Sequence, residues 1–271
     1  MLVMTAGLAL AANTPAIASD HAADETAIRA VLAQSGLLSD ALAGTSQEAD
    51  FGALHVTPQV SSSEPELTFA WKRGCEQDQA DVRIERWLTG ALQIRSGRHA
   101  FTKNVHDRSR REVHLQRSPV DGSWRVASLS AMVANTPQGH TELPLASLDT
   151  ALGSHGFLSV LSDLDELAVC PQTCAVAAPG GFVHVLVGGV DPDAVVMVFA
   201  EGQRVAATSD GGSHFEATLH VTGEGLRSVG VTVYSRRSLV DPRAAADART
   251  WVMPLLVRAA RPEANALAFD L

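Results

Sequence analysis

Residues 110–133 read RREVHLQRSPVDGSWRVASLSAMV, and this stretch decides the fold predicted for the first half of the chain. It contains two runs, 110–118 and 123–133, in which apolar and polar residues alternate. Pro119-Val120-Asp121-Gly122 between them has the composition of a tight turn, so the pattern predicts an antiparallel hairpin. The same alternation appears upstream around Val82 and Ile84, which indicates further strands of one antiparallel sheet.

A helix is predicted before this sheet. Residues 24–43, DETAIRAVLAQSGLLSDALA, carry apolar side chains at near-helical spacing, with acidic residues at the start, where the helix dipole favours them. Residues 44–66 are rich in Ser, Thr, Glu and Pro and are interpreted as a loop. We therefore expect an α+β domain over residues 20–135, followed by a linker over residues 136–175.

The second half has no comparable helical stretch and reads as all-β. Turn signals such as Asp191-Pro192-Asp193 and Asp210-Gly211-Gly212 separate its short apolar runs. This regular alternation of short apolar runs and turn signals predicts a β-sandwich over residues 176–260, with residues 261–271 as a tail. The candidate strands are 182–187, 194–200, 204–208, 214–221, 228–235 and 251–257.

Two resemblances follow from these patterns. Residues 24–135, with FAWKR at 69–73 and WRVASLS at 124–130, resemble the nuclear-transport-factor-2-like domain, a cone-shaped α+β fold shared by ketosteroid isomerases and polyketide cyclases. Residues 176–258 are similar to bacterial immunoglobulin-like modules, from GGFVHVLVGGV through VGVTVYS to TWVMPLLV. Together they imply a helix-and-curved-sheet cone followed by a β-sandwich, an arrangement that resembles uncharacterised secreted bacterial proteins.

The N-terminal stretch predicts export. Residues 1–19, MLVMTAGLALAANTPAIAS, are apolar and uncharged, and Ala16-Ile17-Ala18 offers the small residues of a signal-peptidase site. The stretch is too short to favour a membrane-spanning helix, which needs about 20 apolar residues. We expect a signal peptide and a periplasmic or extracellular protein without a membrane span.

The net charge and the cysteine content restrict the partners and the kinds of site that we expect. The net charge of −9 argues against a nucleic-acid partner, because phosphate backbones require a basic surface. In an oxidising compartment Cys170 and Cys174 could form a disulfide that closes a short loop, while Cys75 is interpreted as a buried thiol. We expect no metal site and no cofactor, because no motif for either is present.

Two groups of residues are candidates for a site. His114 is the candidate acid or base, because it lies in a strand between Val113 and Leu115. Arg108, Arg110 and Arg111 belong to a basic concentration in an acidic chain and could bind an anion. The alternative interpretation of both groups is a solvated sheet face with local ion pairs.

Two functions remain open. The first is a non-catalytic binding or interaction module whose partner is a protein, a glycan or a small apolar ligand. The alternative, implied by the resemblance to isomerases and cyclases, is a small-molecule enzyme that uses acid and base residues inside the cone. Because the single tyrosine, Tyr234, falls in the second predicted domain, we expect no tyrosine-based oxyanion hole in the cone.

Overall fold

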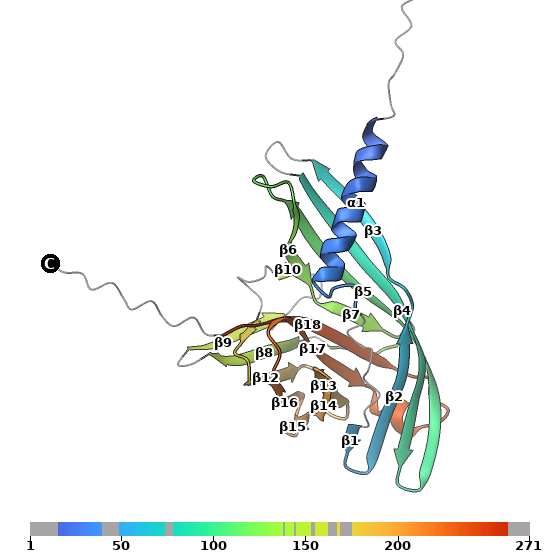
Figure 1. Cartoon of the computed structure of the whole chain (residues 1–271). Helices are drawn as coiled ribbons and strands as arrows, with labels where there is room; N and C mark the ends of the chain where they lie inside the picture. Colours follow the sequence, from blue (N-terminus) through green and yellow to red (C-terminus); the bar gives the residue numbers. More distant parts are fainter. Residues whose placement is uncertain are drawn as a thin grey trace, which may run out of the picture.

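The computed structural model describes residues 16–39, 49–73, 78–137, 139–143, 145–152, 155–161, 167–168 and 175–259. Within these ranges most residues lie in β-strands, and the helices are α1 (Ala16–Gln34) and the short α2 (Arg236–Val240). Figure 1 shows α1 lying across the upper strands of a large curved sheet, with a second, smaller sheet below and to the left.

A hairpin of two long strands organises the large sheet. β4 (Asp78–Ser96) pairs along its whole length with β5 (His99–Arg117). Each long strand changes its outer neighbour part-way, because no other strand is long enough to cover it. The first half of β4 pairs with β3 (Glu66–Arg73) and the second half with β2 (Leu54–Ser62), which also pairs with β1 (Ala49–Phe51).

The other long strand connects the two halves of the chain. β5 pairs with β6 (Trp124–Ser130) and then with β7 (Met132–Asn135). β7 in turn pairs with β18 (Ala248–Val257), near the end of the described chain. The sheet continues through β17 (Gly225–Tyr234), β13 (Val195–Ala200) and β14 (Gln203–Ala206). β14 and β1, the two ends of this path, lie in contact, so the sheet is barrel-like and nearly closed.

A second sheet covers part of the first. Apolar residues from both sheets form the largest buried cluster, which includes Val185, Leu219, Val231 and Trp251. Two minor strands, β10 (Leu167–Ala168) and β11 (Ala175–Ala177), extend the large sheet beside β6 and β18. The second sheet contains β15 (Thr208–Ser209), β16 (His214–Val221), β12 (Gly181–Gly188), β8 (Leu145–Leu152) and β9 (His155–Leu161), in that order.

The predicted fold class, an α+β cone followed by a β-sandwich, is wrong. Strands from both halves belong to one predominantly β, nearly closed sheet, and the pairing of β7 with β18 joins them. The predicted loop over 44–66 contains β1 and β2, and the predicted linker over 136–175 contains β8, β9 and β10. Helix α1 overlaps the predicted range 24–43 over residues 24–34, but it begins and ends earlier than predicted. The division into domains stays a prediction.

The inner face of the β4–β5 hairpin forms one continuous row of side chains. Because strand side chains alternate between faces, the even-numbered residues of β4 and the odd-numbered residues of β5 share this face. At its upper end Val82 and Val113 pack beneath Ile28 and Leu32 of α1, both fully buried. Trp124 Nε1 also donates a hydrogen bond to Asp24 Oδ1 of α1 at 3.0 Å.

Some sequence predictions fall outside the described residues. These are the main part of the predicted signal peptide (1–15), the predicted tail, Cys75 and the predicted Cys170–Cys174 disulfide. Among the described helices, none combines the length and hydrophobicity that a membrane span requires.

Candidate functional site

The site begins where the inner face of the hairpin changes from apolar to polar. Below the residues that carry α1, three cross-strand pairs follow: Ile84 with Arg111, Arg86 with Ser109, and Leu88 with Asp107. Directly opposed residues of an antiparallel pair lie about 5 Å apart and share one face. The register of the hairpin therefore places two arginines and one aspartate on the concave side of the sheet.

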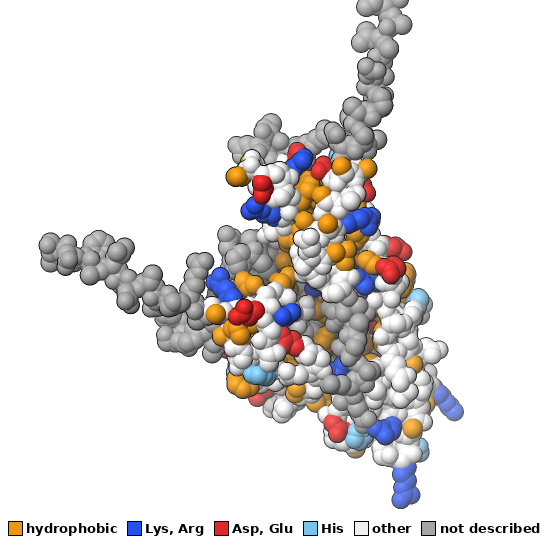
Figure 2. Space-filling view, viewed as in Figure 1, with side chains coloured by type: hydrophobic (Ala, Val, Ile, Leu, Met, Phe, Trp, Pro, Cys, Tyr) orange, Lys and Arg blue, Asp and Glu red, His pale blue; other side chains and the backbone are white. Residues whose placement is uncertain are grey.

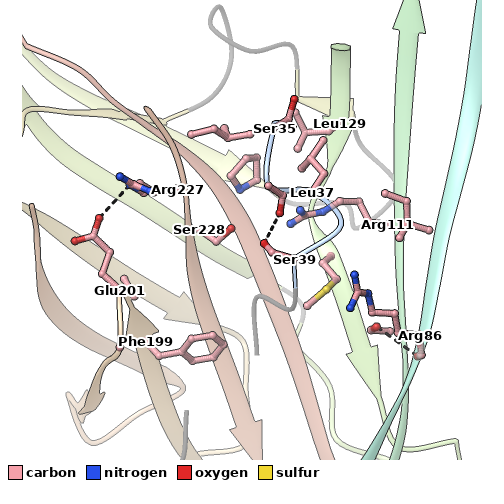
Figure 3. Close-up of a pocket in the computed structure, with 18 of the residues that line it drawn as sticks. Ser35, Leu37, Ser39, Arg86, Arg111, Leu129, Phe199, Glu201, Arg227 and Ser228 are labelled. Atoms are coloured by element: carbon pink, nitrogen blue, oxygen red, sulfur yellow. Dashed lines mark hydrogen bonds and ion pairs between the residues drawn. The ribbon is translucent and has the colours of Figure 1, made fainter. Parts of the chain in front are cut away.

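A pocket of about 350 Å³ lies over this stretch. Its walls are the turn after α1 (residues 35–39), the middle of the hairpin, and the facing parts of β13, β17 and β18. Figure 3 shows that these walls come from segments far apart in the sequence. Leu37, Ile84 and Leu129 are among its apolar lining residues, and Ser109 and Ser228 among its hydroxyl-bearing ones. The volume is in the lower part of the range typical of small-molecule sites.

Arg111 is the most unusual residue of this pocket. Its side chain is buried, with 6% exposure, and Figure 3 shows its guanidinium directed toward the turn that carries Leu37. Nη2 donates to the carbonyl oxygen of Val252 at 3.1 Å, whereas the buried Nε has no partner among the described residues. Burial lowers the pKa of Arg111 to about 10, so the group stays cationic at neutral pH.

Two more arginines line the pocket. Arg86 donates to the carbonyl oxygen of Leu38 and to Ser62 Oγ at 3.3 Å. Arg227 Nε lies 3.4 Å from Glu201 Oε1, and Figure 3 marks this ion pair. Glu201 is the one carboxylate among the described residues that line the pocket, which therefore holds three guanidinium groups against one carboxylate.

Glu201 is already engaged outside the pocket. Its Oε2 accepts hydrogen bonds from the backbone nitrogen and the hydroxyl of Thr222, at 2.8 and 2.9 Å, and its Oε1 accepts one from the backbone nitrogen of Gly223. Burial acts to raise the pKa of Glu201, but these hydrogen bonds and the charge of Arg227 outweigh it and lower the pKa. Glu201 is thus a stable anion that pairs with Arg227, and the described residues provide no carboxylate for Arg111 or Arg86.

This arrangement suits an anion with an apolar body. An unpaired buried charge is costly, and an anion that reaches Arg111 would relieve that cost with charge-assisted hydrogen bonds.

On the outside of the molecule the charges are distributed differently. Figure 2 shows acidic and basic side chains scattered over the visible face rather than gathered in one patch.

The structure separates the three arginines singled out in the sequence. Arg111 has an odd number and lies in the pocket, whereas Arg108 and Arg110 have even numbers and are exposed on the outer face of β5. Arg108 Nη2 pairs with Glu85 Oε2 at 2.8 Å and its guanidinium lies over the ring of Trp87. The local ion-pair interpretation therefore describes Arg108.

His114 also lies on the outer face and is not among the residues that line the pocket. Its Nδ1 lies 2.5 Å from Asp81 Oδ1, directly opposite on β4, and Lys72 Nζ lies 2.6 Å from Asp81 Oδ2. Burial acts to raise the pKa of Asp81, but the hydrogen bonds and charges of Lys72 and His114 outweigh it and lower the pKa. His114 belongs to a three-residue polar cluster on the outside of the hairpin.

Arg86 belongs to the basic concentration noted in the sequence, but neither Arg86 nor Arg227 was predicted as a site residue. A signal for the first was present: Asp107, Ser109 and Arg111 alternate on the same face of β5 that carries the buried Val113 and Leu115, and polar residues on a buried face indicate a lined cavity. Arg227 had no local signal, because its place depends on the path of β17 through the sheet. The described residues contain no group of three or more His, Cys, Asp or Glu arranged to hold a metal ion.

No protein-family model, no curated protein and no solved structure matches the chain. Nothing in these comparisons identifies the nuclear-transport-factor-2-like or immunoglobulin-like modules that the sequence resembles.

Proposed function

We propose that this protein binds a small amphipathic carboxylate in the pocket at Arg111 and has no catalytic role. The observation that carries the proposal is the buried guanidinium of Arg111, which has one backbone hydrogen bond and no carboxylate partner among the described residues. The apolar walls around it favour a ligand with a hydrocarbon body. With the export predicted from residues 1–19, the protein would meet this ligand outside the cytoplasm.

Titration calorimetry of the full chain with decanoate tests the proposal. We expect saturable binding with one site per chain, and much weaker binding of decanol, which has the same apolar body without the charge. Arg111→Met should weaken decanoate binding by about tenfold or more, because a hydrogen bond to a charged group contributes about 1.5–3 kcal/mol.

Arg110→Met is the matched control. It removes the same kind of side chain one residue away, on the outer face of β5, and should leave decanoate affinity unchanged. The proposal fails if decanoate and decanol bind equally well, or if Arg111→Met binds decanoate as tightly as Arg110→Met and the unmodified chain do.

A further inference from the structure

A second, smaller cavity lies between the β4–β5 hairpin and the strands β13, β17 and β18. It measures about 60 Å³, and Val60, Leu92, Val105 and Met197 form part of its apolar lining. Space of this size admits a few water molecules or one small chemical group, but no ring system. Its polar lining residues are Asp107, Thr136, Arg204, Thr232, Tyr234 and Thr250.

The structure brings Tyr234 and Asp107 into this one cavity, although the sequence assigned them to different domains. Tyr234 is buried, with 5% exposure, and burial raises its pKa to about 12, so its hydroxyl is protonated at neutral pH. No hydrogen bond to this hydroxyl occurs among the described residues. The buried Nε of Arg204 also has no partner among them. The cavity therefore contains two donor groups without a partner among the described residues, together with the Asp107 carboxylate, which accepts from Thr136 Oγ1 at 2.9 Å.

The cavity and the pocket adjoin each other. Leu88 and Phe199 line both, so these two side chains form the wall between them. Arg111 and Asp107 lie four residues apart on one face of β5, which at about 3.3 Å per residue corresponds to about 13 Å. An extended chain bound at Arg111 that passes Phe199 would bring its far end to Asp107 and Tyr234.

We infer that the smaller cavity is the far subsite of the Arg111 pocket. It takes a hydroxyl group at the end of the bound ligand that lies opposite the carboxylate. The inference rests on the proposed function and narrows its ligand to an ω-hydroxylated carboxylate of medium chain length. Such a hydroxyl accepts from Tyr234 or Arg204 and donates to Asp107. The chain would pass Leu88 and Phe199, the two residues that line both spaces.

The experiment compares ω-hydroxydecanoate with decanoate by titration calorimetry of the full chain. The hydroxy acid should bind about two- to tenfold more tightly, the gain that one net hydrogen bond provides. Tyr234→Phe should reduce this preference, because it removes the tyrosine hydroxyl that donates to the ligand hydroxyl. Arg204→Met should reduce the same preference, and it provides a second readout if the tyrosine variant does not fold.

The outcomes separate the two proposals. Decanoate binding that depends on Arg111, with no gain from the added hydroxyl, overturns the far subsite and leaves the proposed function intact. A preference for the hydroxy acid that persists in both the Tyr234 and Arg204 variants also overturns the subsite. If neither acid binds, both proposals are wrong.

Discussion

Arg111 on β5 donates through Nη2 to the carbonyl oxygen of Val252 on β18, at 3.1 Å. β7 lies between these two strands in the sheet, so the arginine side chain reaches past one strand to bind the next. The bond fixes the guanidinium at the junction between the two halves of the chain. Because this carbonyl oxygen carries no net charge, the guanidinium of Arg111 has no counterion among the described residues.

Arg111→Met should therefore leave the free energy of unfolding unchanged or raise it by about 1–2 kcal/mol, although the variant binds ligand poorly. An apolar side chain of similar length removes the desolvation cost of the buried cation and fills the same space. Urea denaturation without ligand measures this. A loss of more than about 2 kcal/mol would mean that the guanidinium stabilises the fold.

Asp107→Asn should become more stable relative to the unmodified chain as the pH rises. Burial raises the pKa of Asp107 and the charge of Asp247 acts the same way, whereas the hydrogen bond from Thr136 and the charge of His106 oppose them. The folded state thus retains this proton more tightly than the unfolded state. Stability falls as the pH rises from the ordinary value of 3.8 through the raised folded value, and asparagine removes that loss.

Asp121→Asn is the control of opposite sign. Hydrogen bonds from Ser118 and Ser123 lower the pKa of the exposed Asp121, so its contribution is present above the ordinary pKa and is lost as the pH falls. Urea denaturation over a pH series should show the two variants diverging in opposite directions from the unmodified chain. Parallel profiles would contradict the placement of Asp107 in the cavity.

Gly230→Ala should destabilise the protein by about 1–3 kcal/mol, the usual cost of overpacking. Gly230 lies opposite Phe199 on the neighbouring strand, and a Cβ at this position would overlap the Phe199 ring. The loss should largely disappear in a Phe199→Ala background, because the ring is then absent. Thermal unfolding of the double-mutant cycle measures the coupling, and additive effects would show that the ring is placed elsewhere.

Gly90→Ala should cost about 3 kcal/mol of stability. Gly90 has a φ of 154°, and a Cβ there would overlap the backbone carbonyl of Gln59 on β2. Gly97→Ala in the turn after β4 is the matched control. Its φ is 58° with open space around it, so only the left-handed backbone is penalised, by about 1 kcal/mol. Equal losses for the two variants in urea denaturation would contradict the close approach of β2 to Gly90.

Local strand patterns were readable from the sequence, whereas the connections between strands were not. The predicted strand 214–221 is β16, and 182–187 and 251–257 lie within β12 and β18. The hairpin in residues 110–133 is also present as β5 and β6, with its turn between Ser118 and Ser123. Alternation identifies strands because it reflects burial on one face. It carries no information about which distant strand supplies the neighbour.

The candidate site shows the same division. Arg111 was singled out, but its separation from Arg108 and Arg110 depended on knowing which face of β5 is concave. Tyr234 was assigned to a different domain from Asp107, because nothing in the sequence predicts that β7 pairs with β18. Tyr234 and Asp107 lie on strands that are remote in the chain and are brought together by that pairing. The free energy of the pairing comes from side chains spread over the whole sheet.

Helix α1, the Arg111 pocket and the Asp107 cavity all rest on the β4–β5 hairpin, and this restricts which insertions and deletions in its coding sequence are tolerated. Ile28 and Leu32 of α1, the Arg111 pocket and the Asp107 cavity all depend on one row of odd-numbered side chains on β5. Deletion of one codon among residues 108–110 would reverse the facing of the residues before it relative to the residues after it. Arg111 and Asp107 would then stand on opposite sides of the sheet. Changes in length within this segment are therefore tolerated only in pairs of residues.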